Sequence, residues 1–369
     1  MEYSFTKCKY QKIHPSIELK RVYLLKKIRN YFYDVIKKKT KTLKKKIISS
    51  IFSRWYFSQF INGKCFQDPL IVSPISIATV KDDIEYQQKN GFTAVKVSNE
   101  FYNNFFRKLK TKCDSSIREI KKIKKLDKYQ ITQVTDDNII TLSLHINNKS
   151  YDVAIEKRVY LKLKLKYNSK DYELNTLLWC LINRYTVLKI YNLQLAVHPD
   201  LYKKIHEELG VNFELFASSI NHYYDNYCSL FYDIEKYFGS KGSFFGMKLY
   251  SGFYSFNPPF DELLMVKAVE HIIKQLKNTK KELAFFITIP VWDKASMLKL
   301  KLKYIPKHVP KYKALEKLKQ SGMIRYHKIY KREKFPYFDY VTSEVKHVAN
   351  THVIILANYK LKKSIQDSL

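Results

Sequence analysis

The chain has 369 residues, 46% of them hydrophobic and 27% charged, and its 67 Lys and Arg outnumber 34 Asp and Glu to give a formal net charge of +33. This composition excludes disorder of the whole chain, and the charge predicts a polyanionic partner. Lys greatly outnumbers Arg, and Tyr, Phe, Ile and Asn are abundant, so part of the charge reflects an AT-rich genome.

The cysteines and the apolar runs indicate in which cellular compartment the protein works and whether it enters a membrane. The five cysteines form no CxxC pair and the ten His residues no ligand cluster, so we expect no disulfide framework, no bound metal and a reducing compartment. No apolar run reaches the roughly 18 residues of a membrane span, and residues 1–10 lack a signal-peptide core. The sequence therefore predicts a soluble, intracellular protein with no membrane partner. The cysteines are Cys8, Cys65, Cys113, Cys180 and Cys228.

Residues 1–170 are predicted to form a basic, mainly α-helical domain with a small β-hairpin. Apolar residues recur at helical spacing in 17–36 and in 47–60, and another basic helix is expected at about 100–127. Residues 1–60 contain sixteen basic and three acidic side chains. These Lys-rich helix faces fit either contact with a polyanion or a simple solvated surface.

The next segments differ from these helices. Residues 61–100 contain two prolines among β-branched residues and are expected to be irregular or extended. Residues 139–146 and 151–155 alternate apolar and polar side chains around Asn147-Asn148, which predicts a hairpin. Residues 159–165 also alternate apolar and charged side chains, as a further strand would.

Residues 171–369 are predicted to form an α/β core. Helices are expected at 173–190 and 199–209, the second one ending at Gly210. Another helix, 261–277, lies between two apolar runs of strand length, and this order predicts a parallel sheet with right-handed crossovers. The predicted buried strands are 211–216, 229–234, 253–256, 283–289, 323–330 and 352–356.

Glycine is scarce and unevenly placed. The chain has only eight glycines, and four of them, Gly239, Gly242, Gly246 and Gly252, fall within fourteen residues. Such clustering predicts a place where the backbone turns tightly or where a ligand approaches it closely.

The strongest local signal is Asn257-Pro258-Pro259-Phe260, between a predicted strand and helix. This pattern resembles that of methyltransferases acting on exocyclic amines of nucleobases. The Asn257 side-chain oxygen and the Pro258 carbonyl can accept both hydrogens of adenine N6 and direct its lone pair at a methyl donor. Phe260 offers a face for base stacking, worth roughly 1–3 kcal/mol, and the prolines stiffen the loop. The alternative is a plain turn between strand and helix.

Two further segments are candidates for cofactor binding. Phe216, Ala217 and Ser218 follow a predicted strand, at the position where nucleotide-type cofactors meet an open α/β sheet. Asp233 and Glu235 end the next predicted strand, where a carboxylate can hold a ribose hydroxyl pair. The alternative for either acid is an ordinary surface carboxylate.

Between residues 184 and 292 the chain resembles the catalytic core of the phosphorylated CTD-interacting factor family, the cap-specific mRNA (adenosine-N6)-methyltransferases. Residues 347–351 also resemble this family. The blocks that carry the resemblance are Arg184-Tyr185, Leu215 to Ser218, Tyr227 to Phe231, Tyr237 to Phe245, Phe256 to Met265 and Ile289 to Trp292.

This resemblance implies a Rossmann-like methyltransferase core that uses S-adenosylmethionine to methylate N6 of the 2′-O-methyladenosine beside the cap of mRNA. It implies a catalytic role for Asn257, Pro258, Pro259 and Phe260, and cofactor contacts from Phe216, Ala217, Ser218, Asp233 and Asn257. The chain shows no signature of the family's WW domain, so we expect no WW-mediated binding to polymerase tails. A viral protein of this kind would be cytoplasmic, and a cellular one nuclear.

Two other functions remain open from the sequence. A DNA adenine-N6 methyltransferase would use the same four residues but would have to flip its base out of a duplex. A catalytically silent RNA-binding relative would retain the fold and the charge. In each case residues 294–334, with fourteen basic and two acidic side chains, are our first choice for phosphate contacts.

Overall fold

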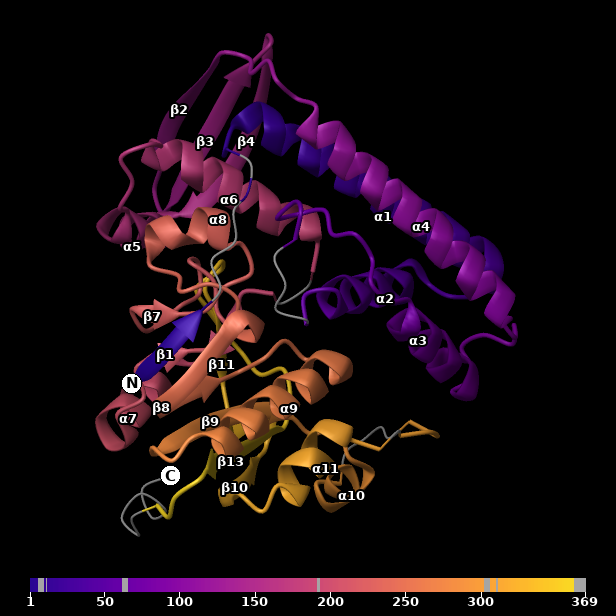
Figure 1. Cartoon of the computed structure of the whole chain (residues 1–369), viewed down its shortest axis with the longest axis vertical. Helices are drawn as coiled ribbons and strands as arrows, with labels where there is room; N and C mark the ends of the chain where they lie inside the picture. Colours follow the sequence, from indigo (N-terminus) through magenta and orange to yellow (C-terminus); the bar gives the residue numbers. More distant parts are fainter. Residues whose placement is uncertain are drawn as a thin grey trace.

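The structure is a computed structural model, and it joins a group of N-terminal helices to a mixed β-sheet (Figure 1). Cys8 and Cys65 lie outside the described residues, as do small parts of the basic segment 294–334. The described residues are 1–5, 10, 12–61, 66–190, 193–301, 306–309 and 311–361.

Four helices make up the N-terminal part: α1 (Pro15–Thr40), α2 (Lys45–Ser58), α3 (Ala78–Lys89) and α4 (Asn99–Lys121). The predicted helices are confirmed, and α1 and α4 lie side by side (Figure 1). The expectation of irregular structure throughout 61–100 is wrong, because Val80 and Ile84, one turn apart, are buried against the other helices as part of α3.

A separate antiparallel sheet follows: β2 (Tyr129–Asp136), β3 (Ile139–Ile146) and β4 (Lys149–Glu156). The predicted hairpin of β3 and β4 is confirmed, and Asn147 and Asn148 both have positive φ, as its tight turn requires. Strand β2 was not predicted, because it is exposed along almost its whole length and carries little apolar alternation.

The predicted strand at 159–165 is wrong, because Lys157–Lys166 forms helix α5. Its buried side chains, Val159, Tyr160 and Leu163, follow helical rather than strand spacing. Leu165 is 87% exposed. The alternation in the sequence therefore did not reflect a buried strand face.

The C-terminal part begins with α6 (Leu174–Leu188) and α7 (Pro199–Leu209), which confirm two predicted helices. Gly210 ends α7 in the left-handed conformation, with φ of +70°. The remaining strands are β5 (Leu195–Val197), β6 (Phe213–Glu214), β7 (Asn226–Tyr227), β8 (Met247–Phe256), β9 (Leu283–Pro290), β10 (Ile324–Tyr330), β11 (Tyr337–Asp339), β12 (Glu344–Lys346) and β13 (Thr351–Ala357). The remaining helices are α8 (Tyr232–Glu235), α9 (Glu262–Asn278), α10 (Lys294–Lys299) and α11 (Lys313–Gln320).

The main sheet has the strand order β10-β13-β9-β8-β6-β7. Strands β7, β6, β8 and β9 are parallel, whereas β13 and β10 add antiparallel pairings, and β1 (Glu2–Phe5) pairs antiparallel with the start of β8. The α/β class is confirmed, but the sheet is mixed rather than purely parallel. The division near residue 170 stays a prediction, and β1 carries the start of the chain into this sheet.

Strand β9 shows why the central strands have continuous apolar sequences. All of its residues are buried. Leu283, Phe285 and Ile287 face a core shared with α9 and α11, whereas Ala284 and Phe286 face the core that includes α6. Both faces of this strand are therefore covered, and the predictions for β8, β9, β13 and α9 are confirmed. Strand β10 is present as predicted, but the prediction that it is buried is wrong, because all of its residues are half-buried or exposed at the end of the strand order.

The first two predicted strands of this sheet are in part wrong. The predicted strand 211–216 shrinks to two residues, Phe213 and Glu214. The predicted strand 229–234 is a loop that leads into α8, and β7 lies before it. The carboxylate of Glu235 accepts the Phe231 N–H at 2.8 Å, which supplies this backbone donor with a partner outside a sheet.

Of the clustered glycines, Gly252 shows a close backbone approach. It has φ of +117°, and a Cβ there would lie 2.2 Å from the Met1 side chain. The glycine thus lets the start of the chain lie against β8. Gly246, in contrast, lies at the cavity described below.

A buried ion network joins the N-terminal helices to the C-terminal part. Arg184 on α6 donates to both oxygens of Glu18 on α1, at 2.9 and 3.0 Å, and to Asp233 on α8 at 2.7 Å. Arg21 donates to Glu18 at 3.2 Å and to Asp68 at 2.8 Å. Both arginines and Glu18 are fully buried. Loss of one partner would leave a buried charge uncompensated.

Helix α9 begins at a buried cap. Asp261 accepts the Leu264 N–H at 2.7 Å and is 3% exposed. Burial raises the pKa of Asp261 from its usual value near 3.8 to about 6, although the Leu264 N–H acts in the opposite direction.

Within the described ranges, no helix combines the length and apolar character needed to span a bilayer.

We predict that Arg184→Met lowers the free energy of unfolding by about 3–5 kcal/mol, because it leaves Glu18 and Asp233 buried without their shared cation. Lys20→Met is the matched control, since it removes the solvent-accessible pair of Lys20 with Glu119 and a contact with the Tyr23 ring, and it should lower stability by less than about 1 kcal/mol. Urea unfolding measures both. Equal effects of the two substitutions would contradict the structural role of the network.

We predict that Asp261→Asn changes how stability depends on pH. The native carboxyl holds its proton more tightly than the unfolded one, so wild-type stability falls as pH rises through the window from about 4 to 6. Asn retains the cap without this titration, so its stability relative to wild type should increase through that window. Asp261→Ala, which loses the cap, should be about 1 kcal/mol less stable than Asp261→Asn. Parallel pH curves for wild type and Asp261→Asn would refute the assignment.

Candidate active site

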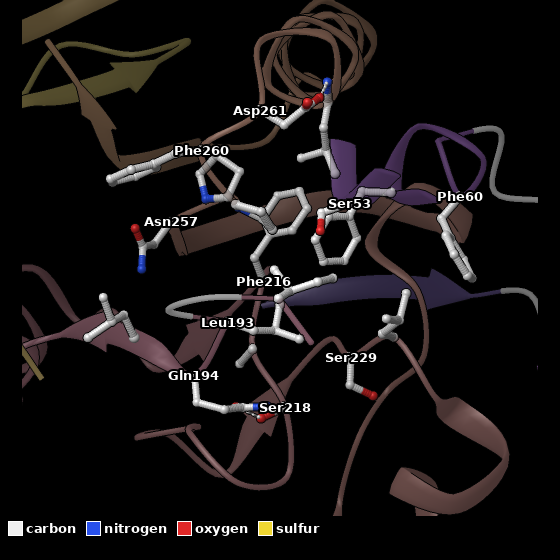
Figure 2. Close-up of a pocket in the computed structure, with 18 of the residues that line it drawn as sticks. Ser53, Phe60, Leu193, Gln194, Phe216, Ser218, Ser229, Asn257, Phe260 and Asp261 are labelled. Atoms are coloured by element: carbon white, nitrogen blue, oxygen red, sulfur yellow. Dashed lines mark hydrogen bonds between the residues drawn. The ribbon is translucent and has the colours of Figure 1, made fainter. Parts of the chain in front are cut away.

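A cavity of about 870 Å³ lies between α2 and the edge of the main sheet (Figure 2). The parallel strands β6, β7, β8 and β9 all end there, and the residues that follow each strand line the cavity. The carboxyl edge of parallel strands is the usual place for ligands in open α/β sheets. The lining residues after these strands include Leu215 to Ser218, Cys228 to Leu230, Asn257 to Asp261, and Pro290 with Trp292.

All four residues of Asn257-Pro258-Pro259-Phe260 line this cavity, directly after β8. The Asn257 Oδ1 accepts a hydrogen bond of 2.9 Å from the hydroxyl of Thr288 on β9, which is 1% exposed. The Pro259 carbonyl accepts the Asp261 N–H at 2.7 Å and closes the turn into α9. The amide of Asn257 is therefore held by a neighbouring buried strand, and the described residues leave its second Oδ1 lone pair open.

Two aromatic rings fix the plane of Phe260. Tyr337 on β11 lies perpendicular to it with ring centroids 5.9 Å apart, and Trp292 does so at 6.3 Å. Phe260 itself is half-buried and borders the cavity. These edge-to-face contacts keep the ring in one orientation, as a stacking platform requires.

Phe216, Ala217 and Ser218 are also brought to the cavity. The Phe216 ring packs against Phe244 at 4.8 Å and Phe256 at 5.4 Å. The Ala217 N–H donates to the Cys228 carbonyl at 3.0 Å, so the loop continues the pairing of the strands. The three residues thus form a well-supported wall beside Asn257.

Asp233 is not among the residues that line the cavity. Its side chain is 6% exposed and bonded to Arg184 in the ion network. Glu235, considered with it, is fully buried and accepts the Ser219 N–H at 2.7 Å and the Tyr185 hydroxyl at 3.1 Å. Both acids therefore stand behind the cavity wall, and Glu235 supports its loop directly.

Buried titratable groups brace the same loop from the other side. Lys162 on α5 donates to the carbonyls of Ile220 at 2.8 Å and His222 at 3.1 Å, and burial lowers its pKa to about 8. Glu214 accepts the N–H groups of Tyr223 and Tyr224, and burial raises its pKa to about 7. His222 is kept neutral, since burial lowers its pKa to about 3. Its Nδ1 lies 3.1 Å from the Ser218 carbonyl, so the ring contacts the same loop.

The sequence reasoning missed the opposite wall. Helix α2 directs a polar stripe into the cavity, and Arg54 is oriented there by Asp83, whose oxygens it meets at 2.7 and 3.0 Å. The helical spacing of this stripe was a usable signal, but the sequence left open whether the basic face of α2 contacts a polyanion or only solvent. Gln194, which also borders the cavity, carried no local signal. The stripe consists of Lys46, Ser49, Ser50, Ser53 and Arg54, and the apolar Phe57 of α2 also lines the cavity.

Among the residues with described positions, no three His, Cys, Asp or Glu side chains converge as metal ligands would.

Comparison with known proteins gives one family model and two curated relatives. Residues 157–339 match a family model described as the phosphorylated CTD interacting factor 1 WW domain. The match covers just under half of the chain and includes Asn257 to Phe260. Because that description names a WW domain, it does not support our expectation that the chain lacks one.

Two curated relatives are both named mRNA (2′-O-methyladenosine-N(6)-)-methyltransferase. The mouse protein is 29% identical over 240 residues, which cover 59% of this chain and 32% of the relative. The human protein is 30% identical over 228 residues, which cover 58% of this chain and 31% of the relative. The chain thus spans about a third of the length of the curated relatives it matches.

Proposed function

We propose that this protein methylates N6 of the cap-adjacent 2′-O-methyladenosine of capped mRNA, with S-adenosylmethionine as methyl donor. The observation that carries the proposal is the position of Asn257 to Phe260 at the carboxyl edge of β8, facing a cavity large enough for a cofactor and a base. The names of the mouse and human relatives support the same chemistry.

The residues present fit this cofactor. The parallel strands β7, β6, β8 and β9 support a Rossmann-like methyltransferase core, whose ligand site lies at the strand ends. Phe216, Ala217 and Ser218 would hold the cofactor against the sheet. Gln194 offers an amide nitrogen that has no hydrogen-bond partner among the described residues. For Asp233 we propose an indirect role, through Arg184 and the support of α8. When bound, S-adenosylmethionine supplies an electrophilic methyl group.

The side chains around Asn257 would position the target amine. The open lone pair of Asn257 Oδ1 and the Pro258 carbonyl accept the two N6 hydrogens, which removes the amine lone pair from conjugation and directs it into the cavity. Thr288 keeps the amide in this orientation. Phe260 stacks on the base, and its perpendicular neighbours prevent it from turning away. Neither acceptor is a strong base, so the displaced N6 proton passes to water.

Basic side chains would position the RNA. Lys46 and Arg54 on α2 and Lys189 after α6 border the cavity, and the excess of Lys and Arg on 1–60 and 294–334 continues the positive charge beyond it. Such contacts fix the register of a nucleic acid without reading its sequence.

We predict that labelled methyl groups are transferred to capped RNA that starts with 2′-O-methyladenosine. Uncapped RNA of the same sequence and duplex DNA should remain unlabelled, and capped RNA that starts with guanosine is the matched control. Label on duplex DNA would instead favour the DNA methyltransferase. RNA binding with no label on any substrate would favour the silent relative.

We predict that Asn257→Ala lowers the turnover rate by at least about 100-fold, because it removes one of the two acceptors that orient the amine. The Michaelis constant for capped RNA should change by less than about threefold, since the basic contacts remain. Asn278→Ala, an exposed change at the far end of α9, serves as the control and should retain wild-type turnover. Turnover by Asn257→Ala within threefold of wild type would show that the amine is held by other groups.

A further inference from the structure

Gln194 lies in the segment between α6 and β5, with its side chain beside Ser218 at one end of the cavity (Figure 2). It is only 8% exposed. Its main-chain carbonyl accepts the Tyr340 N–H at 3.4 Å, which connects the segment to the turn after β11. The side chain is therefore part of the cavity wall and not a surface group.

The hydrogen bonds of Ser218 determine which end of the Gln194 amide is the oxygen. The Ser218 hydroxyl accepts the N–H groups of Ile220 at 3.2 Å and Asn221 at 3.1 Å, which occupies both of its lone pairs. Its single proton is then available to an acceptor, and Gln194 Oε1 lies 2.7 Å away. The Asn221 Oδ1 is farther away, at 3.0 Å, and also accepts the Ser218 N–H at 2.7 Å, whereas a Gln194 nitrogen at 2.7 Å would find no free lone pair on the Ser218 hydroxyl. Oxygen therefore faces Ser218, and nitrogen is the opposite end of the amide.

This nitrogen has no hydrogen-bond partner among the described residues. Of the described side chains that line the cavity, Gln194 is the one with such a buried, unpaired polar atom. Buried donors without acceptors are rare in native proteins, and each requires an explanation. An acceptor brought by a ligand would provide one.

We propose that Gln194 Nε2 donates a hydrogen bond to the bound cofactor, an inference that rests on the proposed function. The cofactor is favoured over the RNA because Gln194 is bonded to Ser218, in the loop directly after β6, whereas the target amine belongs at Asn257. S-adenosylmethionine has acceptors at both ends, in its carboxylate and in its adenine ring. Gln194 is thus a cofactor-binding residue, and it favours ligands that place a hydrogen-bond acceptor opposite its Nε2.

The test measures binding of S-adenosylhomocysteine by isothermal titration calorimetry to the full chain. Gln194→Glu keeps the acceptor for Ser218 and replaces the donor by an oxygen, so we expect affinity to fall by roughly 10- to 100-fold. Gln194→Met removes the donor without adding charge and should show a loss as well. Gln130→Glu adds the same charge on exposed β2 and should bind like wild type.

A second ligand, 5′-methylthioadenosine, has the nucleoside but no carboxylate. If the variants also bind it more weakly, the acceptor is in the nucleoside, and if they bind it normally, the acceptor is the carboxylate. Thermal unfolding without ligand verifies that each variant is folded. Affinity for S-adenosylhomocysteine within twofold of wild type in both folded Gln194 variants would overturn the inference. It would also be overturned if the variants lost affinity for capped RNA but not for S-adenosylhomocysteine. Failure of wild type to bind S-adenosylhomocysteine would instead contradict the proposed function itself.

Discussion

The buried network of two arginines and three carboxylates is the constraint on which the rest of the structure depends. Arg184 bridges Glu18 on α1 and Asp233 on α8, so one guanidinium holds a helix from each part of the chain. Arg29 strengthens the same junction by donating to the carbonyls of Val187 and, at 2.7 Å, Leu188 at the end of α6. Such groups add little net stability over an apolar core, but any other placement of the parts that separates them would leave a buried charge without its partner.

That placement creates the cavity. One wall comes from α2, which packs against α1, and the other comes from the loops after β6, β7, β8 and β9. Neither wall encloses a ligand without the other. The loop after β6 is held in place without a ligand. Its main-chain groups are hydrogen-bonded to the buried side chains of Glu235, Glu214 and Lys162. Groups already in place when a ligand arrives require little reorganisation.

Local sequence was enough to predict the parts of the site that depend on neighbouring residues. Asn257 to Phe260 could be placed because a buried strand before them and an apolar stripe after them put the turn at a sheet edge. The long helices and the buried strands β9 and β13 could be predicted because their periodicity and length are strong signals. The short strand β6 and helix α8 could not, because buried carboxylates decide the backbone there. Glu214 and Glu235 accept main-chain N–H groups of nearby loops, and Glu235 is held in turn by the hydroxyl of Tyr185, 50 residues away.

Other residues are set by contacts that no local pattern contains. A carboxylate after a strand suggested Asp233 as a ribose ligand, but its environment depends on Arg184, 49 residues away in the sequence. Gln194 stands out only when the hydrogen bonds of Ser218, 24 residues away, are known. The polar stripe of α2 was visible, yet only the tertiary fold shows that it faces the cavity.

The most direct measurement is a crystal structure of the protein with S-adenosylhomocysteine and a capped oligonucleotide that starts with 2′-O-methyladenosine. The account predicts that S-adenosylhomocysteine lies against Phe216 to Ser218, with N6 of the adenosine within hydrogen-bond distance of Asn257 Oδ1 and the Pro258 carbonyl. Ligands bound outside the cavity between α2 and the sheet, or an adenosine whose N6 points away from Asn257, would contradict it.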